Sequence, residues 1–398
     1  MSNQNPVFIP GPTNIPERLR RAISQPTIDH RSSSFGTMFK PLFPGVKKVL
    51  KTETGEVIMF PATGTAGWES AISNTLSPGD KILACRHGMF SHRWIDMCKR
   101  WGLDVQQLNA PWGAGAPAAD FQAALEADKN HEIKAVLVTH NETATGVRSD
   151  VAAVRKAIDA AGHPALLLVD GVSSIASMDF RMDEWGVDVA ITGSQKGFML
   201  PAGLSIVGVS QKALKAMETA KLPRCFLDWR DMLNTNPKGG FPYTPPVGLF
   251  FGLGEALKMI EEEGLENVFA RHHRMAEGVR RAVDAWGLKL CAHSPDLYSE
   301  TISAILVPEG QDSTKLVVHA ADKYGVAFGI GLGEVAGKVF RIGHLGSLTD
   351  VMALSGIGTA EMAMADLGYP IELGSGVAAA QEYYRNSAAA EPKLAKSA

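Results

Sequence analysis

The sequence predicts an α/β protein with a large, mainly parallel β-sheet that helices cover on both faces. Two observations support this fold class. Between residues 55 and 210, short apolar runs alternate with stretches that have a helical spacing of apolar residues. After about residue 255, long amphipathic patterns replace this alternation and indicate a second, smaller α+β unit.

Several runs in the first part have the apolar, β-branched composition of buried strands. They are residues 56–60, 81–85, 135–139, 165–170, 187–192 and 205–209. A helix is expected at 68–76, directly after the first of these strands. Because the strand at 205–209 follows its predecessor too closely for a helical crossover, we expect it to run antiparallel to its neighbour.

The second part is expected to contain helices at 254–264, 268–286 and 349–367, with strands at 301–307 and 340–343. These patterns suggest a division into four segments. They are an N-terminal arm at 1–20, a large domain at 21–255, a small C-terminal domain at 256–376 and a C-terminal tail at 377–398. The tail is rich in Ala, Ser and Lys and is expected to fray at its end.

The composition is ordinary for a soluble globular protein that buries a large core. The chain has 398 residues, 45% of them hydrophobic and 20% charged, with a net charge of −3, and no stretch concentrates Lys and Arg as a nucleic-acid binder would. The four cysteines are scattered without CxxC spacing, and His87, His92 and His272–His273 have no zinc-like spacing, so neither a disulfide framework nor a metal site is expected. Signal and membrane-span patterns are absent, which favours a cytoplasmic location.

A lysine follows one of the predicted strands. The segment Thr192-Gly-Ser-Gln-Lys196-Gly comes after the run at 187–192, and α/β sheets bind their ligands at the carboxyl ends of their strands. Among apolar residues the Lys196 ammonium would lose solvation, its pKa would fall, and the neutral amine could attack an aldehyde. Taken alone, the same short motif is also typical of a surface lysine in a loop.

An aspartate ends the preceding predicted strand. Asp170 closes the apolar run at 165–170. A strand-terminal aspartate beside a bound pyridine ring can keep the ring nitrogen protonated, which makes the ring an electron sink. The alternative is a helix N-cap or a turn former, because Gly-Val-Ser-Ser follows this aspartate.

Small residues connect the first predicted strand to the helix after it. The segment Ala62-Thr-Gly-Thr-Ala-Gly67 would let backbone N–H groups at a helix N-terminus approach an anion such as a phosphate. Thr63 and Thr65, on either side of Gly64, could add hydroxyl donors. The segment lacks the Walker lysine and the GxGxxG spacing, so it is a weak signal by itself.

In this order, an anion-binding loop, a strand-end aspartate and a strand-end lysine resemble the fold-type I enzymes that depend on pyridoxal 5′-phosphate (PLP). More narrowly, residues 8–346 resemble the class V branch that contains serine–glyoxylate and alanine–glyoxylate aminotransferases. The resemblance is carried by Pro10-Gly-Pro-Thr-Asn, Asp29-His-Arg-Ser, Thr139-His-Asn-Glu-Thr-Ala-Thr-Gly146, Val169-Asp-Gly-Val-Ser-Ser174, Gly193-Ser-Gln-Lys196 and Arg341-Ile-Gly. It implies a seven-stranded, mainly parallel sheet between helices, with a smaller α+β C-terminal domain.

The resemblance also implies roles for individual residues around PLP. Lys196 would hold the cofactor as a Schiff base and later move a proton, and Asp170 would pair with the pyridinium nitrogen. The ring would lie between Val172 and Phe90, where relatives often have tryptophan. Further cofactor contacts would come from Gly64, Thr65, Thr143, Gln195 and Thr244.

The substrate carboxylate would be bound by Arg341, whose planar guanidinium suits a bidentate contact. The backbone of Pro10 and Gly11 would cover that carboxylate. Residues 241–244 match a segment that crosses between subunits in this family, so Thr244 would reach over from a partner subunit and at least a homodimer is expected. Phe241 stands where some relatives supply a tyrosine hydroxyl, and Tyr243 is the alternative donor.

The activity that the resemblance implies is transamination of L-serine and glyoxylate to hydroxypyruvate and glycine by a ping-pong mechanism, as in the serine cycle or photorespiration. The polar set Asn141, Thr143 and Tyr243 could satisfy a serine hydroxyl. The nearest alternative is an alanine–glyoxylate or other small-amino-acid aminotransferase. A PLP lyase or desulfurase is a second alternative, although no cysteine lies in a clear mobile catalytic loop.

Overall fold

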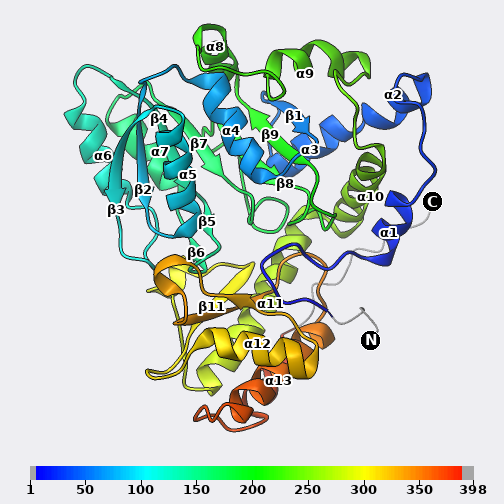
Figure 1. Ribbon diagram of the computed structural model, residues 1–398, viewed down its shortest axis with the longest axis vertical. Coiled ribbons are helices and arrows are strands. Elements are labelled where there is room, and N and C mark those ends of the chain that lie inside the picture. The colour runs from blue at the N-terminus through cyan, green and yellow to red at the C-terminus, as the bar shows by residue number, and fades with distance from the viewer. Residues whose placement is uncertain (1–5, 388–398) are drawn as a thin grey trace.

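The computed structural model describes residues 6–387 and contains a large and a small β-sheet, each with its own helices (Figure 1). The large sheet has seven strands in the order β1-β9-β8-β7-β4-β2-β3. They are β1 (Glu56–Phe60), β2 (Lys81–Arg86), β3 (Asp104–Asn109), β4 (Ile133–Thr139), β7 (Leu166–Asp170), β8 (Val189–Gly193) and β9 (Ser205–Val209).

Neighbouring strands from β8 to β3 are parallel, whereas β9 is antiparallel to both β8 and β1. The predicted fold class and the antiparallel strand at 205–209 are therefore confirmed. Strand β3 was missed because it lies at the edge of the sheet and alternates between exposed and partly buried residues. Such a strand has no continuous apolar run that would reveal it.

Helices cover this sheet on both faces (Figure 1). The helices of this part of the chain are α1 (Glu17–Ile23), α2 (Ser33–Phe39), α3 (Leu42–Leu50), α4 (Gly64–Thr75), α5 (Met89–Arg100), α6 (Ala118–Ala127), α7 (Val151–Ala160), α8 (Gln211–Thr219), α9 (Trp229–Thr235) and α10 (Val247–Glu263), of which α1 and α2 pack mainly on other helices. Helix α7 shows how the sequence determines them. The Asp150 side chain accepts a hydrogen bond from the N–H of Ala153, and Val151, Val154 and Ile158 form its buried face.

The smaller sheet is antiparallel, in the order β10-β11-β13-β12. Its strands are β10 (Lys289–Leu290), β11 (Ile302–Leu306), β12 (Gly329–Ile330) and β13 (Val339–Gly343), and its helices are α11 (Leu265–Ala285), α12 (Ser313–Tyr324), α13 (Asp350–Asp366) and α14 (Ser375–Asn386). In Figure 1 this sheet lies next to the hairpin of β5 (Asn141–Glu142) and β6 (Val147–Arg148), which follows β4. The small sheet is therefore close to the end of β4 from which that hairpin emerges.

One expectation about the C-terminus was wrong. The tail was expected to begin at 377, but residues 377–386 belong to α14, which packs on α11 and α13. Ala380 and Tyr384, one helical turn apart, are both buried. Because these two residues share one face of the helix, the segment can pack on the small domain although its composition is polar and rich in alanine. The fraying expected at the end of the tail falls on residues 388–398, which lie outside the described part of the chain.

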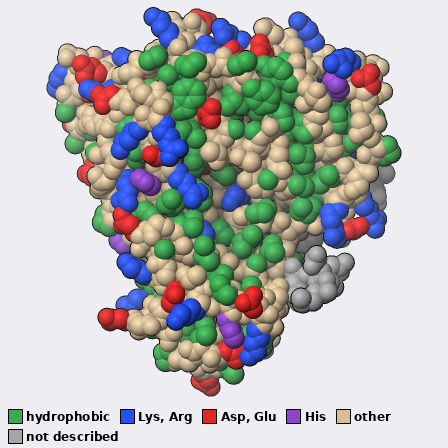
Figure 2. Space-filling view, viewed as in Figure 1, with side chains coloured by type: hydrophobic (Ala, Val, Ile, Leu, Met, Phe, Trp, Pro, Cys, Tyr) green, Lys and Arg blue, Asp and Glu red, His purple; other side chains and the backbone are tan. Residues whose placement is uncertain are grey.

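Within residues 6–387, no helix is both long and apolar enough to cross a membrane. Figure 2 shows apolar side chains mixed with charged side chains of both signs over one face of the molecule.

Candidate active site

Three buried ionisable side chains come together at the carboxyl edge of the large sheet. Asp170 is the last residue of β7, and Lys196 follows the neighbouring parallel strand β8. Arg341 comes from β13 of the smaller sheet. The charges of Arg341 and Asp170 both act on Lys196, in opposite directions. The structure thus brings together the three side chains that the sequence singled out from distant segments.

Lys196 is only 9% exposed. Its Nζ donates a hydrogen bond to the carbonyl oxygen of Pro10. Burial, together with the charge of Arg341, lowers the pKa of Lys196 to about 8, and the charge of Asp170 opposes this change. A lysine with this pKa is partly neutral near physiological pH, which is the form that attacks a carbonyl compound.

The N-terminal arm passes directly over Lys196. A Cβ atom at Gly11 would lie 2.6 Å from Cδ and 2.7 Å from Nζ of the lysine, and the φ of +106° at Gly11 also favours glycine. The arm is further held by the N–H of Thr13, which donates to the carbonyl oxygen of Gln195 (3.2 Å). Glycine at position 11 therefore allows the arm to cover the amine without displacing it.

Asp170 is also buried, and burial raises its pKa to about 7. Its Oδ1 accepts a hydrogen bond from the N–H of Val172 (2.9 Å). The carboxyl group therefore also shapes the turn after β7, as the alternative interpretation of the sequence expected. A raised pKa means that the folded chain supplies too little positive charge to stabilise this carboxylate.

The turn between β1 and α4 brings backbone donors to the same edge. Thr63 is the N-cap of α4, but its side chain forms no hydrogen bond with the helix, and both Thr63 and Thr65 are exposed. Gly64 packs closely on Val172, because a Cβ atom at Gly64 would lie 2.4 Å from Val172 Cγ2. The first turn of α4 therefore presents N–H groups that suit an anion.

Buried polar atoms without partners lie beside this turn. Within residues 6–387, Gln195 Oε1 and Ser205 Oγ are buried and have no hydrogen-bond partner, and a Cβ atom at Gly67 of α4 would lie 2.7 Å from Ser205 Oγ. A Cβ atom at Gly193 would lie 2.8 Å from Gln195 Oε1 and 3.3 Å from the backbone nitrogen of Gly64. Buried polar groups are normally paired, so this concentration of unpaired ones is suited to a polar ligand.

No carboxylate is among the hydrogen-bond partners of Arg341 within residues 6–387, so its positive charge is available to a substrate carboxylate. Its Nε donates to the carbonyl oxygen of Ile330 (2.9 Å) and its Nη1 to that of Thr143 (2.8 Å), so both contacts are with neutral groups. Burial lowers its pKa to about 10, and the charge of Glu142 opposes that change. A Cβ atom at Gly329 would lie 3.1 Å from both Arg341 Nε and Pro10 Cδ, which places the arginine beside the arm.

A buried polar network joins Thr143 to the smaller sheet. Thr143 Oγ1 and Ser173 Oγ are 2.7 Å apart, and the Asn141 amide donates to Ser173 Oγ (2.8 Å) and to Thr301 Oγ1 (2.9 Å). Asn141 Oδ1 is buried without a partner. The sequence alone does not mark Ser173 or Thr301 as parts of the site, because only the folded chain brings such separate segments together.

Phe90 lies in the first turn of α5 and is partly buried. Its N–H donates to both carboxylate oxygens of Glu142, at 3.1 Å each. Glu142 is a further residue that sequence analysis did not identify, although it belongs to the motif at 139–146. The backbone N–H groups that it binds have no sequence signal.

Tyr243 and Thr244 are not among the hydrogen-bond partners of Lys196, Gln195 or Arg341 within the described chain. The Tyr243 hydroxyl donates to Asp231 Oδ2 (2.7 Å), and Thr244 is exposed. The roles of Tyr243 and Thr244 at the cofactor remain predictions.

A mainly parallel seven-stranded sheet with a lysine, an aspartate and an arginine buried at its carboxyl edge, together with a smaller α+β unit, is the architecture of a fold-type I transferase. Residues 19–338 match the family described as aminotransferase class V. The chain belongs to this family and is an aminotransferase. Class V aminotransferases and their fold-type I homologues are PLP enzymes.

Two curated relatives are similar over almost the whole chain. The L-aspartate–glyoxylate aminotransferase of Paracoccus denitrificans is 69% identical over 99% of this chain and 100% of its own length. The serine–glyoxylate aminotransferase of Methylorubrum extorquens is 57% identical over 96% of this chain and 97% of its own. Among solved structures, pyridoxamine–pyruvate aminotransferase from Mesorhizobium loti matches with a TM-score of 0.90 at 28% identity, covering 98% of this chain and 99% of that one.

Proposed function

We propose that the protein is a PLP-dependent glyoxylate aminotransferase that takes L-serine as its amino donor and forms hydroxypyruvate and glycine. The observation that carries this proposal is the buried Lys196 amine, whose pKa is lowered to about 8 and whose charge interacts with those of Asp170 and Arg341. The serine–glyoxylate aminotransferases of Methylorubrum extorquens and Arabidopsis thaliana, 57% and 49% identical, support the choice of substrates.

The described residues fit PLP. A phosphate suits the backbone N–H groups of the N-terminal turn of α4 at Gly64, and the neighbouring Gln195 amide could donate to it through Nε2. A protonated ring nitrogen suits Asp170, because a nearby cation would stabilise a carboxylate that burial disfavours. When bound, the cofactor supplies an electron-withdrawing ring that stabilises negative charge at the substrate Cα.

The residues of the chain have separate tasks in this reaction. Arg341 binds the α-carboxylate of the donor and later that of glyoxylate, and the arm at Pro10 and Gly11 excludes water from it. The Nζ of Lys196 accepts the proton from the substrate Cα in its neutral form, which its lowered pKa favours. Asp170 holds the proton on the ring nitrogen.

A panel of amino donors with glyoxylate as acceptor tests the proposal. A site that hydrogen-bonds the serine hydroxyl leaves polar groups unpaired with alanine. Serine should therefore exceed alanine in kcat/KM by at least about tenfold, or roughly 1.4 kcal/mol. Pyruvate formation from alanine that equals or exceeds hydroxypyruvate formation from serine would instead favour an alanine–glyoxylate aminotransferase.

L-Aspartate is a second candidate donor. The observation that favours it is the 69% identity to the L-aspartate–glyoxylate aminotransferase of Paracoccus denitrificans. Oxaloacetate is the product to measure in the same panel, and faster formation of oxaloacetate than of hydroxypyruvate would identify aspartate as the donor.

The location of the protein is a separate proposal. The four cysteines are free, which supports a reducing, cytoplasmic location.

A further inference from the structure

Glu142, at the end of β5, is a carboxylate that is completely buried. Its oxygens accept hydrogen bonds from the backbone N–H groups of Phe90 (3.1 Å), Ser91 (2.9 Å) and Ala144 (3.2 Å). A carboxylate is expensive to bury unless such donors surround it. Glu142 is thus held at one place by backbone groups of two separate segments.

Two of these donors belong to the N-terminus of α5. The N-cap of this helix is Gly88, which has no side chain that could accept hydrogen bonds from the first N–H groups. The carboxylate of Glu142, from a distant part of the chain, accepts them instead. A Cβ atom at Gly88 would lie 2.1 Å from Cγ and 2.2 Å from Cδ of Glu142. The glycine therefore makes room for the carboxylate that replaces its missing cap.

Glu142 also precedes a residue of the candidate active site in the chain. The next residue, Thr143, binds Arg341 through its carbonyl oxygen. The charge of Glu142 acts on Arg341 and on Asp170, and it adds to the rise that burial causes in the pKa of Asp170. Helix α5 carries Phe90 in the turn that Glu142 caps, so a single side chain connects this aromatic ring to the strand end beside Arg341.

We propose that Glu142 is a positioning residue that, by capping α5, holds the Phe90 ring against one face of the bound cofactor. This inference rests on the proposed function, because it requires PLP at Lys196. Glu142 would act through Phe90 and would not itself touch the cofactor.

A second buried glutamate, in the helices beside the small sheet, offers a matched control for the loss of a helix cap. Glu361 is 2% exposed, and its oxygens accept N–H groups of Gly374 (2.9 Å), Gly376 (2.6 Å) and Val377 (3.2 Å) at the start of α14. It is another buried glutamate that caps a separate helix, but α14 packs on α11 and α13 and carries none of the candidate site residues. Glu361→Gln therefore removes the same kind of cap without moving Phe90.

The experiment is a double-mutant cycle in PLP binding. The dissociation constant of PLP is measured by absorbance titration of the cofactor-free enzyme for wild type, Glu142→Gln, Phe90→Ala and the double variant. Phe90→Ala and Glu142→Gln should each weaken binding by about fivefold, a size typical of a lost ring contact. The double variant should bind no more weakly than Phe90→Ala, because the two changes remove one contact. Glu361→Gln should lower the melting temperature and leave PLP binding unchanged.

Other outcomes would overturn the inference. If the two single effects multiplied in the double variant, Glu142 would act independently of Phe90. If Glu142→Gln lowered only the melting temperature, as Glu361→Gln should, the cap would be purely structural. If Phe90→Ala bound PLP normally, its ring would not contact the cofactor, whereas failure of wild type to bind PLP would refute the proposed function itself.

Gly88→Ala provides a second variant in case Glu142→Gln folds poorly. Its added methyl group would push the intact carboxylate away from α5, so it should weaken PLP binding as Glu142→Gln does. In a Glu142→Ala background the carboxylate that the added methyl group would meet is gone. Gly88→Ala should then have little further effect on PLP binding. Normal PLP binding by Gly88→Ala in the presence of Glu142 would contradict the proposal.

Discussion

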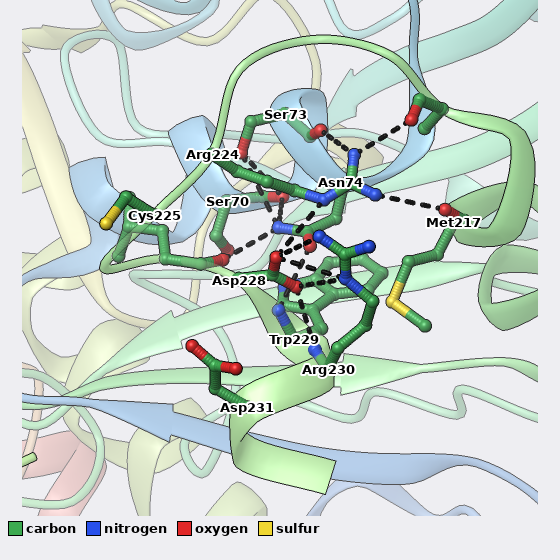
Figure 3. A network of polar contacts seen from close by, with 12 residues as sticks. Ser70, Ser73, Asn74, Met217, Arg224, Cys225, Asp228, Trp229, Arg230 and Asp231 are labelled. Atoms are coloured by element: carbon green, nitrogen blue, oxygen red, sulfur yellow. Dashed lines mark hydrogen bonds and ion pairs between the residues drawn. The ribbon is translucent and has the colours of Figure 1, made fainter. Parts of the chain in front are cut away.

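The two ends of helix α4 differ in how their polar groups are paired. At its N-terminus, Gly64 presents backbone donors beside the unpaired Gln195 side chain. In its last turn, the Asn74 amide donates to the carbonyl oxygens of Ser70 and Leu227 (2.8 Å each), and Asn74 Oδ1 accepts from the N–H of Trp229 (3.0 Å; Figure 3). The Asn74 amide at one end is thus paired within the chain, whereas the N–H groups at the other end are suited to a ligand.

The acidic residues near each end differ in the same way. Although burial acts to raise it, hydrogen bonds from Arg230 hold the pKa of Asp228 below its usual range (Figure 3). Burial raises the pKa of Asp170 to about 7, and the hydrogen bond to its Oδ1 comes from the neutral N–H of Val172, not from a cation. Asp228, which stabilises the fold, is therefore paired with a cation, whereas Asp170 of the site is buried with a neutral donor at a cost in stability.

The largest effect should come from Lys196→Ala. Without the amine, turnover should fall to background, and borohydride should no longer fix PLP to the chain. Lys212→Ala is the control, because Lys212 Nζ is bonded to the carbonyl oxygen of Ala165 and is not part of the site. Mass spectrometry that located reduced PLP on a lysine other than Lys196 in the wild-type protein would refute the assignment.

Asp170→Asn should retain the fold but lose about 10³-fold in kcat, the size expected when a major electrostatic stabiliser is removed. Asp228→Asn is its counterpart at the other end of α4 and should lower the melting temperature while activity persists. Both variants are compared at full PLP occupancy. Turnover of Asp170→Asn within a few-fold of wild type would leave Asp170 as a turn residue only.

The sequence was sufficient to predict the features that depend on the apolar pattern of the strands and on their order in the chain. Asp170 and Lys196 could be identified because each follows an apolar run, and parallel strands place both at one edge. Arg341 was identified by the family resemblance. Strand β3 was missed because it has no continuous apolar run, and helix α14 was missed because its polar, alanine-rich composition hides the helical spacing of Ala380 and Tyr384.

Contacts between backbone groups and distant side chains could not be predicted. Glu142 binds N–H groups of α5, and every residue except proline carries such a group, so no residue type marks the partner. The same holds for Asn74, whose acceptor and donor lie at residues 227 and 229. These contacts exist only once the tertiary fold brings the segments together.

The stability of the cofactor-free chain should depend on pH through Lys196. Burial lowers its pKa from 10.5 to about 8. Between these values the unfolded chain binds a proton that the folded chain lacks, so the free energy of unfolding should rise with pH, by up to about 3 kcal/mol. Urea unfolding of wild type and Lys196→Met at both ends of this range measures the difference, and an equal pH dependence in the two proteins would contradict the lowered pKa.

Thr244→Ala should weaken PLP binding by roughly 1–3 kcal/mol, the penalty for leaving a buried partner unpaired. Thr244 is exposed in the single chain, so this effect is expected only if a partner subunit carries the residue to the cofactor. Sedimentation at assay concentration is the companion measurement. A fully active monomer would disprove the shared site.

The smallest effect on the site should come from Asn74→Ala. This change leaves the carbonyl oxygen of Leu227 and the N–H of Trp229 without their partner, and buried groups of this kind cost roughly 1–3 kcal/mol each when unpaired. The melting temperature should therefore fall clearly. PLP binding should stay within about twofold, because the helix transmits little of a change in its last turn to the donors in its first turn, where the phosphate is expected. If PLP affinity instead fell as much as in Thr244→Ala, the two ends of α4 would be energetically coupled, and the paired end would also have to be counted as part of the cofactor site.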